Sequence, residues 1–321
     1  MSILSSLHAA TPPSVAVELA ANRVSAAAIE FRGGKAVVAA HASEPLPDGV
    51  IVPSLTVANI HDRAALIGAL GRVFDRLGGR PRRVGLVIPD PVAKVSLVRF
   101  EQVPARRQDL DQLVRWQVRK AAPFPVEEAQ VSYAPGFRGA DGQEFIVVSA
   151  RRDIVREYEE VCSEIGSHPG IVDLATFNVV NAVLAGSAPS GDWLLVNVTA
   201  DYASIAILRD EHLIFFRNRA ADTDGTLADL VHQTGMYYED RLSGTGFKRV
   251  LLAGSVGGGV RQAAEVEQVR RSLEERLTTI VETVDPRMAA SLTDRISVAP
   301  ALLDTLAPLV GLLLRGQETV A

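Results

Sequence analysis

Short stretches in which apolar residues alternate with polar or small ones dominate the beginning of the chain, and turn-forming residues separate them. This period of two predicts a β-meander of three consecutive strands. The strands are expected at residues 15–19, 24–31 and 35–41. Apolar residues then recur at helical spacing over 61–77, and Gly78 and Gly79 provide a typical helix stop. The uninterrupted apolar run 84–88 is typical of a central strand.

A different succession of elements follows: a half-exposed strand, a helix, two strands and a further helix. We expect these elements at 93–100, 108–120, 131–134, 144–150 and 153–165. Such a succession is typical of a small α+β unit with its own core. We therefore predict that residues 83–166 form an α+β subdomain inserted into a larger frame.

The layout of the first meander recurs in the second half of the chain. A short strand and a helix return to the frame, and three strands, a helix, a strand, a long helix, a strand and a final helix follow. These elements are expected at 170–172, 174–184, 193–198, 204–209, 212–217, 226–242, around 250, and at 260–277, 279–284 and 301–314. Two meanders, each followed by helices, indicate an internal duplication.

The duplication divides the chain into two lobes and an insertion. We predict an α/β fold in which residues 1–82 and 167–189 form the first lobe and residues 190–321 form the second. The inserted subdomain interrupts the first lobe.

A glycine-rich stretch, Val250-Leu-Leu-Ala-Gly-Ser-Val-Gly-Gly-Gly259, joins the late strand to the long helix. Glycine allows backbone N–H groups to approach a flat or anionic ligand closely, so Gly254, Ser255, Gly257 and Gly258 are candidate nucleotide contacts. The stretch lacks the Gly-Lys-Ser/Thr of a phosphate-binding P-loop. A flexible strand–helix connection is the alternative interpretation.

Composition narrows the class of protein. The 321 residues are 47% hydrophobic and 22% charged, with a formal net charge of −5. These values predict a globular protein and argue against a general nucleic-acid binder. The single cysteine, Cys162, is expected in the core, and the six histidines show no metal-ligand spacing. Because we expect neither a signal peptide nor a membrane-spanning helix, we predict a cytoplasmic protein that reaches the membrane only through a partner.

Several segments, in this order and spacing, resemble the PilM family of type IV pilus assembly proteins, which shares the actin-like ATPase fold of FtsA. They are Leu86-Val-Ile-Pro-Asp90, residues 116–125, residues 170–177, Leu251-Leu-Ala-Gly-Ser255, Val284-Asp-Pro286 and residues 307–315. The resemblance implies a cytoplasmic scaffold of the inner-membrane assembly platform. Its partner would be the N-terminal cytoplasmic segment of a PilN-like membrane protein, and further partners could include the pilus assembly ATPases.

The resemblance also assigns residues to the family's two phosphate-binding turns. Glu18 stands where the family has Asp, Ala20 where it has Gly, and Asn22 lies in the same turn; in the second turn the corresponding pair is Asn197 and Thr199. An added Cβ opposes close backbone approach, and Asn lacks the charge that orients Mg²⁺. We therefore expect ATP, with its Mg²⁺, to bind weakly or not at all. Glu18 could instead be a solvated strand-end carboxylate, and Asn197 a turn former.

No catalytic residue and no independent metal site stand out, so ATP hydrolysis is not expected. The alternatives to a pilus scaffold are an actin-like component of a type II secretion platform and an ATP-dependent phosphotransferase of the same fold. By the same resemblance, the partner segment would lie in a groove between the first lobe and the inserted subdomain. Leu97, Trp116 and Phe124 are candidate groove residues, although ordinary core packing would explain Trp116 and Phe124 equally well.

Overall fold

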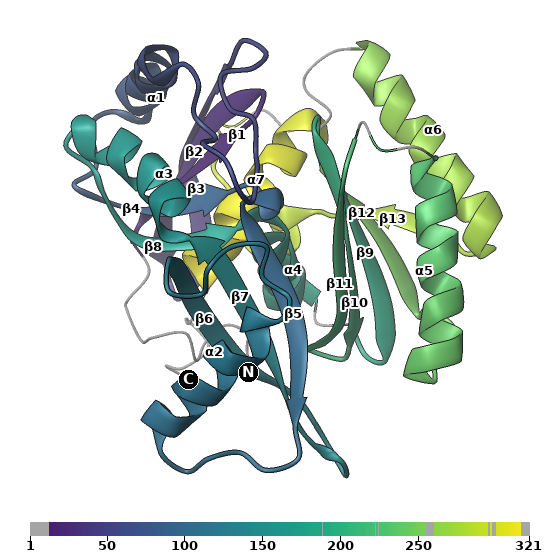
Figure 1. Cartoon of the computed structure of the whole chain (residues 1–321). Helices are drawn as coiled ribbons and strands as arrows, with labels where there is room; N and C mark the ends of the chain where they lie inside the picture. The colour runs from purple at the N-terminus through teal and green to yellow at the C-terminus, as the bar shows by residue number, and fades with distance from the viewer. Residues whose placement is uncertain are drawn as a thin grey trace.

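The structure is a computed structural model that describes residues 13–187, 189–221, 223, 225–254, 260–294, 296 and 300–315. A six-stranded sheet forms the core of the first lobe (Figure 1). The strands β1 (Val15–Ala20), β2 (Arg23–Arg32) and β3 (Lys35–Pro45) form the expected antiparallel meander. Three further strands complete the sheet: β4 (Arg83–Ile88), β8 (His168–Leu174) and β14 (Ser291–Leu292), in the order β14-β3-β2-β1-β4-β8.

The alternation along β1 decides which helices cover the two faces of this sheet. Val17 and Leu19 pack against the helix α1 (Arg63–Leu77), whereas Ala16 lies in a separate core with the helix α7 (Pro300–Leu314). The helix α4 (Ala175–Ser187) packs against α7. Because successive side chains of a strand point to opposite faces, the buried run of β1 contributes to both cores.

A second sheet repeats this arrangement. The meander β9 (Asp192–Val198), β10 (Tyr202–Arg209) and β11 (His212–Ala220) is extended in parallel by β12 (Arg249–Ala253) and β13 (Val281–Thr283). The order β11-β10-β9-β12-β13 matches β3-β2-β1-β4-β8 strand for strand. The helices α5 (Leu227–Leu242) and α6 (Val260–Leu277) cover its outer face (Figure 1). The predicted duplicated α/β frame is confirmed.

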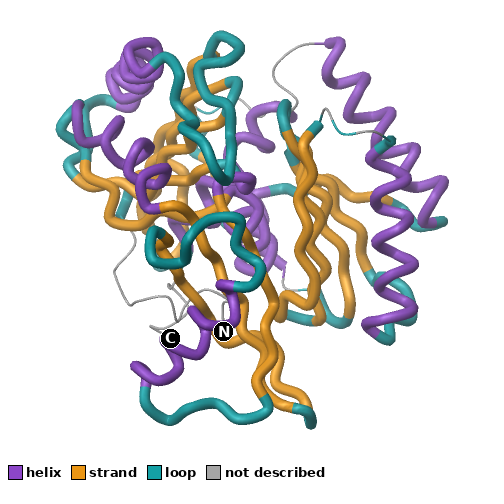
Figure 2. Tube along the Cα trace, in the orientation of Figure 1, coloured by secondary structure: helices purple, strands orange, loops and turns teal. Residues whose placement is uncertain are grey.

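Three strands form a small sheet of their own below the first one (Figure 2). They are β5 (Ala93–Phe100), β6 (Ala129–Gly139) and β7 (Gly142–Arg151), in the order β5-β7-β6. The helix α2 (Arg107–Arg119) shares a core with them. We call β5, β6, β7 and α2 the three-stranded unit. Two 3₁₀ turns, Asp90–Val92 and Pro286–Met288, complete the described elements.

The boundaries of the units differ from those we expected. The strand β4, which we assigned to the insertion, pairs in parallel with both β1 and β8 inside the first sheet. The helix α3 (Arg152–Glu164), also assigned to the insertion, contacts α1 and β8. At the other end of the chain, β14 and α7 pack on the first sheet rather than on the second lobe. Pairing between distant segments leaves no mark on the local pattern from which we divided the chain.

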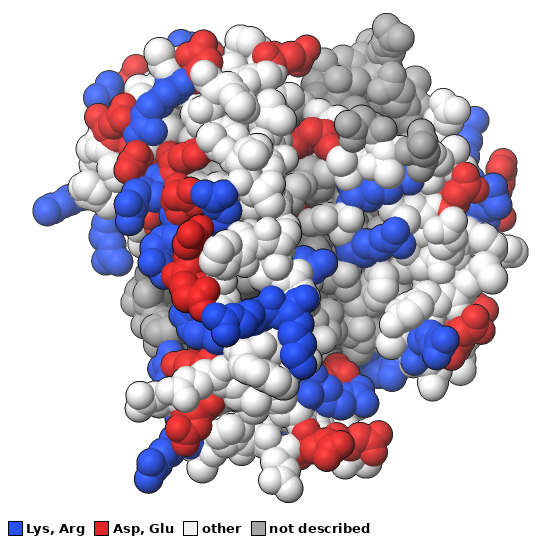
Figure 3. Space-filling view, viewed as in Figure 1, with Lys and Arg blue, Asp and Glu red and all other residues white. Residues whose placement is uncertain are grey.

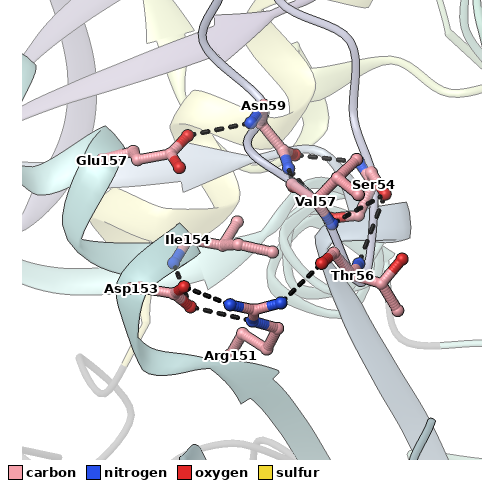
Figure 4. A network of polar contacts seen from close by, with 8 residues as sticks. All are labelled: Ser54, Thr56, Val57, Asn59, Arg151, Asp153, Ile154 and Glu157. Atoms are coloured by element: carbon pink, nitrogen blue, oxygen red, sulfur yellow. Dashed lines mark hydrogen bonds and ion pairs between the residues drawn. The ribbon is translucent and has the colours of Figure 1, made fainter. Parts of the chain in front are cut away.

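Polar contacts fasten the three-stranded unit to the first lobe (Figure 4). Where β7 ends, Arg151 donates to the carbonyl oxygen of Thr56 at 2.6 Å and to Asp153 at 3.0 Å. In the same loop, the backbone N–H of Asn59 donates to Glu157 of α3 at 2.9 Å. The loop between β3 and α1 therefore fastens the chain where it returns from the unit to the first lobe.

Charged side chains of both signs mix over the lobe that carries α1 and α3 (Figure 3). Arg63 of α1 illustrates this, since it donates to Glu164 of α3 at 2.6 Å and to Glu160 at 3.3 Å. These pairs are exposed, so each contributes little to stability.

Close contact between α4 and α7 generates the first prediction. A Cβ added to Gly311 of α7 would lie 1.7 Å from the backbone oxygen of Asn178 in α4. We expect Gly311→Ala to lower the free energy of unfolding by ~3 kcal/mol because the two helices must separate. The matched control is Gly71→Ala in α1, where an added Cβ meets nothing within 4 Å. It should be neutral or stabilise by up to ~1 kcal/mol. Chemical denaturation of both variants measures this, and equal effects would contradict it.

Candidate functional site

The first candidate, Glu18, is an internally bonded carboxylate rather than a solvated strand end. It is 5% exposed, and its Oε2 accepts hydrogen bonds from Arg23 Nη2 at 2.9 Å and from Ser25 Oγ at 3.0 Å. The register of the β1–β2 hairpin pairs Glu18 with Ser25 and Ala20 with Arg23, so all four side chains lie on one face. The turn between these strands is held by Asn22, whose carbonyl oxygen accepts from the N–H of Leu46 at 2.8 Å.

The two residues of the second turn are likewise engaged within the protein. Asn197 is 3% exposed, and its Nδ2 donates to the hydroxyl of Thr176 at 2.8 Å. The Thr199 hydroxyl makes two hydrogen bonds to the backbone of Tyr202. It donates to the carbonyl oxygen at 2.9 Å and accepts from the N–H at 3.1 Å. Asn197 therefore has a structural partner beyond the turn, and Thr199 closes the turn, as threonine often does.

A fully buried carboxylate, Asp90, joins these elements; we named it within a family segment of the sequence but not as a site residue. Its Oδ1 accepts from the backbone N–H of Thr176 at 3.0 Å, and its Oδ2 accepts from the hydroxyls of Thr176 and of Ser204, the latter at 2.6 Å. Burial raises the pKa of Asp90 to about 6, although these hydrogen bonds oppose the shift. The sequence signal was an acidic residue placed directly after the buried strand 84–88 and a proline.

Contacts among Asp90, Thr176, Asn197 and Ser204 span both halves of the molecule. Asp90 follows β4, and Thr176 lies in the first turn of α4; Asn197 and Ser204 belong to β9 and β10 of the second sheet. The amide donor of Asn197 completes the chain of hydrogen bonds through Thr176 to Asp90. A carboxylate at position 197 would lack that donor and place a second negative charge near the first.

The glycine loop is described only at its start. Gly254 has φ 108°, and a Cβ there would lie 1.8 Å from the backbone oxygen of Val198. Close approach to the end of β9 is therefore enough to require glycine at this position. Ser255, Gly257 and Gly258 lie outside the described residues, so their assignment to a nucleotide loop stays a prediction.

Two titratable groups near Arg23 have strongly shifted pKa values. Burial raises the pKa of Asp304 on α7 to about 7, and Arg23 opposes that shift. Burial, and then the charge of Arg23, lowers the pKa of His41 on β3 to about 4. Within the described part of the chain, no three His, Cys, Asp or Glu side chains gather closely enough to hold a metal ion. Near the first turn, the Glu18 carboxylate already has a cationic partner, Arg23 at 2.9 Å, so these residues fit a bound Mg²⁺ poorly.

A separate groove of about 700 Å³ lies between the three-stranded unit and the first sheet. Its lining comes from α2, β6, β8 and the end of α7 and includes Leu110, Arg115, Val131, Tyr133, Ile171 and Asp173. We call this the partner groove. Both β6 and β8 are edge strands of their sheets in the described structure. The buried ion pair between Asp173 and Arg315, 2.9 Å long, closes one side.

Our three candidates for partner contacts do not line this groove. Phe124 is 9% exposed and belongs to the core of the three-stranded unit, which agrees with the alternative of ordinary core packing. Trp116 is 56% exposed on α2 and has the Lys120 ammonium 4.0 Å above its ring. Leu97 lies in the middle of β5, opposite Ile146. The location of the groove depends on how α2 packs against β5 and β7, which the apolar pattern alone could not show.

Two sheets with the same strand order, and an α+β unit inserted between β4 and α3, define the class: this is an actin-like fold. The chain matches the family model described as type IV pilus assembly protein PilM over residues 16–244. It therefore belongs to the PilM family.

A solved structure shares the fold. The chain is similar to the structure titled as the PilM–PilN type IV pilus biogenesis complex, with a TM-score of 0.77 and 17% identity over 97% of this chain and 100% of the other. Weaker similarities include EutJ from Carboxydothermus hydrogenoformans, with a TM-score of 0.49 and 10% identity over 98% and 94% of the two chains. The cytoplasmic domain of EpsL from Vibrio cholerae has a TM-score of 0.47 and 12% identity over 96% and 95%.

No curated protein matches the chain significantly. Among the described helices, none combines the length and the apolar character needed to cross a membrane.

The raised pKa of Asp304 generates the second prediction. Since the folded protein holds this proton up to about pH 7 and the unfolded chain releases it near pH 3.8, ionising Asp304 destabilises the fold as the pH rises. We expect Asp304→Asn to be more stable than the wild type at pH 8. The advantage should shrink by ~2 kcal/mol between pH 8 and pH 5. Exposed Asp48→Asn is the control and should change little at either pH. A pH-independent effect of Asp304→Asn would contradict the assignment.

Proposed function

We propose that the protein is a scaffold of the type IV pilus inner-membrane assembly platform. In this role it binds the N-terminal cytoplasmic segment of a PilN-like membrane protein and so lies at the cytoplasmic face of the membrane through that partner. Membership of the PilM family and similarity to a PilM–PilN complex support the proposal. The observation that carries it in this chain is the partner groove.

The shape of the groove suits an extended peptide. It lies between two edge strands, β6 and β8, whose outer backbone groups have no strand partner among the described residues. A peptide in extended conformation could satisfy its main chain by adding to such an edge, while alternate side chains enter the space on either side. A volume of about 700 Å³ falls in the range of specific binding pockets.

The lining offers both apolar contact and charge. Leu110, Val131 and Ile171 contribute half-buried apolar side chains, and the exposed Arg115 lies at the same surface. Tyr133 is held in place because its hydroxyl donates to Asp111. Apolar side chains would supply most of the affinity, and the fixed polar groups would set the register of the peptide.

We also propose that the protein is not an enzyme and that its nucleotide site is degenerate. Glu18, Asn197 and Thr199 already bind neighbouring groups of the protein, which supports this proposal. ATP would therefore bind weakly or not at all. Phosphate release from ATP by the purified protein should not exceed the blank. Turnover that Glu18→Ala abolishes would overturn this part of the proposal.

Filling the partner groove tests the peptide function. A labelled synthetic peptide with the N-terminal cytoplasmic sequence of the PilN-like protein from the same source should bind the wild-type protein. Ala105→Trp places an indole in the groove from an exposed position of its lining and should weaken binding at least roughly tenfold, ~1.4 kcal/mol. Fluorescence anisotropy measures the affinity.

A matched substitution in the same unit provides the control. Ala121 is also exposed but does not line the groove, so Ala121→Trp should bind the peptide like the wild type. Both variants should melt within ~1 °C of the wild type, since each replaces an exposed side chain. Equal binding by the two variants, or no binding by the wild type, would overturn the proposed site.

A further inference from the structure

Glu18 forms an ion pair with Arg23 of its own hairpin, and this pair is the feature that least resembles a metal–nucleotide site. Arg23 Nη2 lies 2.9 Å from Glu18 Oε2, and the side chains are only 11% and 6% exposed. Ser25 donates to the same oxygen at 3.0 Å. The actin-like frame would imply a Mg²⁺ near this carboxylate, yet the carboxylate charge is already neutralised and one oxygen already accepts two hydrogen bonds.

The charge of Arg23 reaches acidic groups on three separate elements. Besides Glu18 on β1, it opposes the burial-induced rise in the pKa of Asp201, in the β9–β10 turn, and in that of Asp304 on α7. Arg23 Nε is buried and has no hydrogen-bond partner among the described residues. Its Nη1 donates to Asn22 Oδ1 at 3.4 Å, so the guanidinium is held by Glu18 and Asn22 of its own hairpin.

We propose that Arg23 is an internal cation that takes the place of a metal ion beside Glu18. It neutralises Glu18 within the hairpin, so the hairpin needs neither Mg²⁺ nor a nucleotide. A divalent ion brought to the same carboxylate would be repelled by the guanidinium and would have to displace its hydrogen bond. Arg23 is thus a positioning residue: it holds the Glu18 carboxylate in place without a bound ligand.

Removing the internal cation tests this inference. Arg23→Ala leaves a buried carboxylate without its counter-ion, and the variant should melt at a lower temperature than the wild type. Because a small cation can then enter and stabilise the folded state, 10 mM Mg²⁺ should raise the melting temperature of Arg23→Ala by about 3 °C. The same Mg²⁺, with or without ATP, should shift the wild type by less than about 1 °C.

Three further variants separate a metal-replacing role from ordinary packing. Arg23→Ala combined with Glu18→Gln should lose the response to Mg²⁺, because the carboxylate is gone. Arg23→Lys keeps a positive charge and should not respond. Arg72→Ser is the matched control, since Arg72 also pairs at 2.9 Å with a buried carboxylate, Glu44, which keeps Arg76 as a second partner. It should show no response to Mg²⁺.

The response of these variants to cations distinguishes a metal-replacing Arg23 from an ordinary ion pair. Stabilisation of Arg23→Ala by Mg²⁺ that depends on Glu18 supports the inference; if this variant is unfolded without metal, recovery of its circular dichroism spectrum with Mg²⁺ supports it equally. Stabilisation by methylguanidinium but not by Mg²⁺ would show an ordinary ion pair and overturn it. No response to either cation, or a wild type stabilised by Mg²⁺ through Glu18, would also overturn it.

Discussion

The carboxylate of Asp90 is the interaction on which the arrangement of the two halves depends. It lies at zero exposure where β4 ends, and it accepts hydrogen bonds from the first turn of α4 and from a serine of the second sheet. A carboxylate that binds a helix N-terminus and two hydroxyls compensates much of the free energy lost on burial. Any movement of one lobe against the other must break these bonds in a medium where unpaired polar groups are costly.

The candidate side chains of the two turns are held by bonds within the protein. Asn197 donates to Thr176, which donates to Asp90, and Glu18 accepts from Arg23 and Ser25. In each case a side chain that could face a ligand is oriented by a neighbour instead. These bonds therefore support a fixed geometry between the lobes.

The groove itself follows from where the three-stranded unit is attached. The unit leaves the frame just after β4 and returns to it just before α3, and the loop that carries Thr56 and Asn59 bonds to the returning chain (Figure 4). This attachment places the edge strand β6 across from the edge strand β8. Both edges are unpaired among the described strands, a feature that proteins usually cover or block. A peptide partner would cover them.

Local pattern determined the elements of this protein by itself. The alternation over the two meanders, the glycine stop at Gly78 and the helix at 260–277 all predicted the observed structure, because hydrophobic period and turn chemistry act within a few residues. The equivalence of the two meanders could also be predicted from the pattern, whereas the actin-like class was implied by the resemblance to the PilM family.

Tertiary structure decided which elements share a sheet and what each polar side chain binds. It placed β4 and α7 with the first sheet, made Phe124 a core residue, left Trp116 outside the partner groove, and engaged Asn197 and Glu18 within the protein. Contacts of this kind join residues distant in sequence, such as Asp90 and Ser204, and their energies depend on burial that no local pattern records.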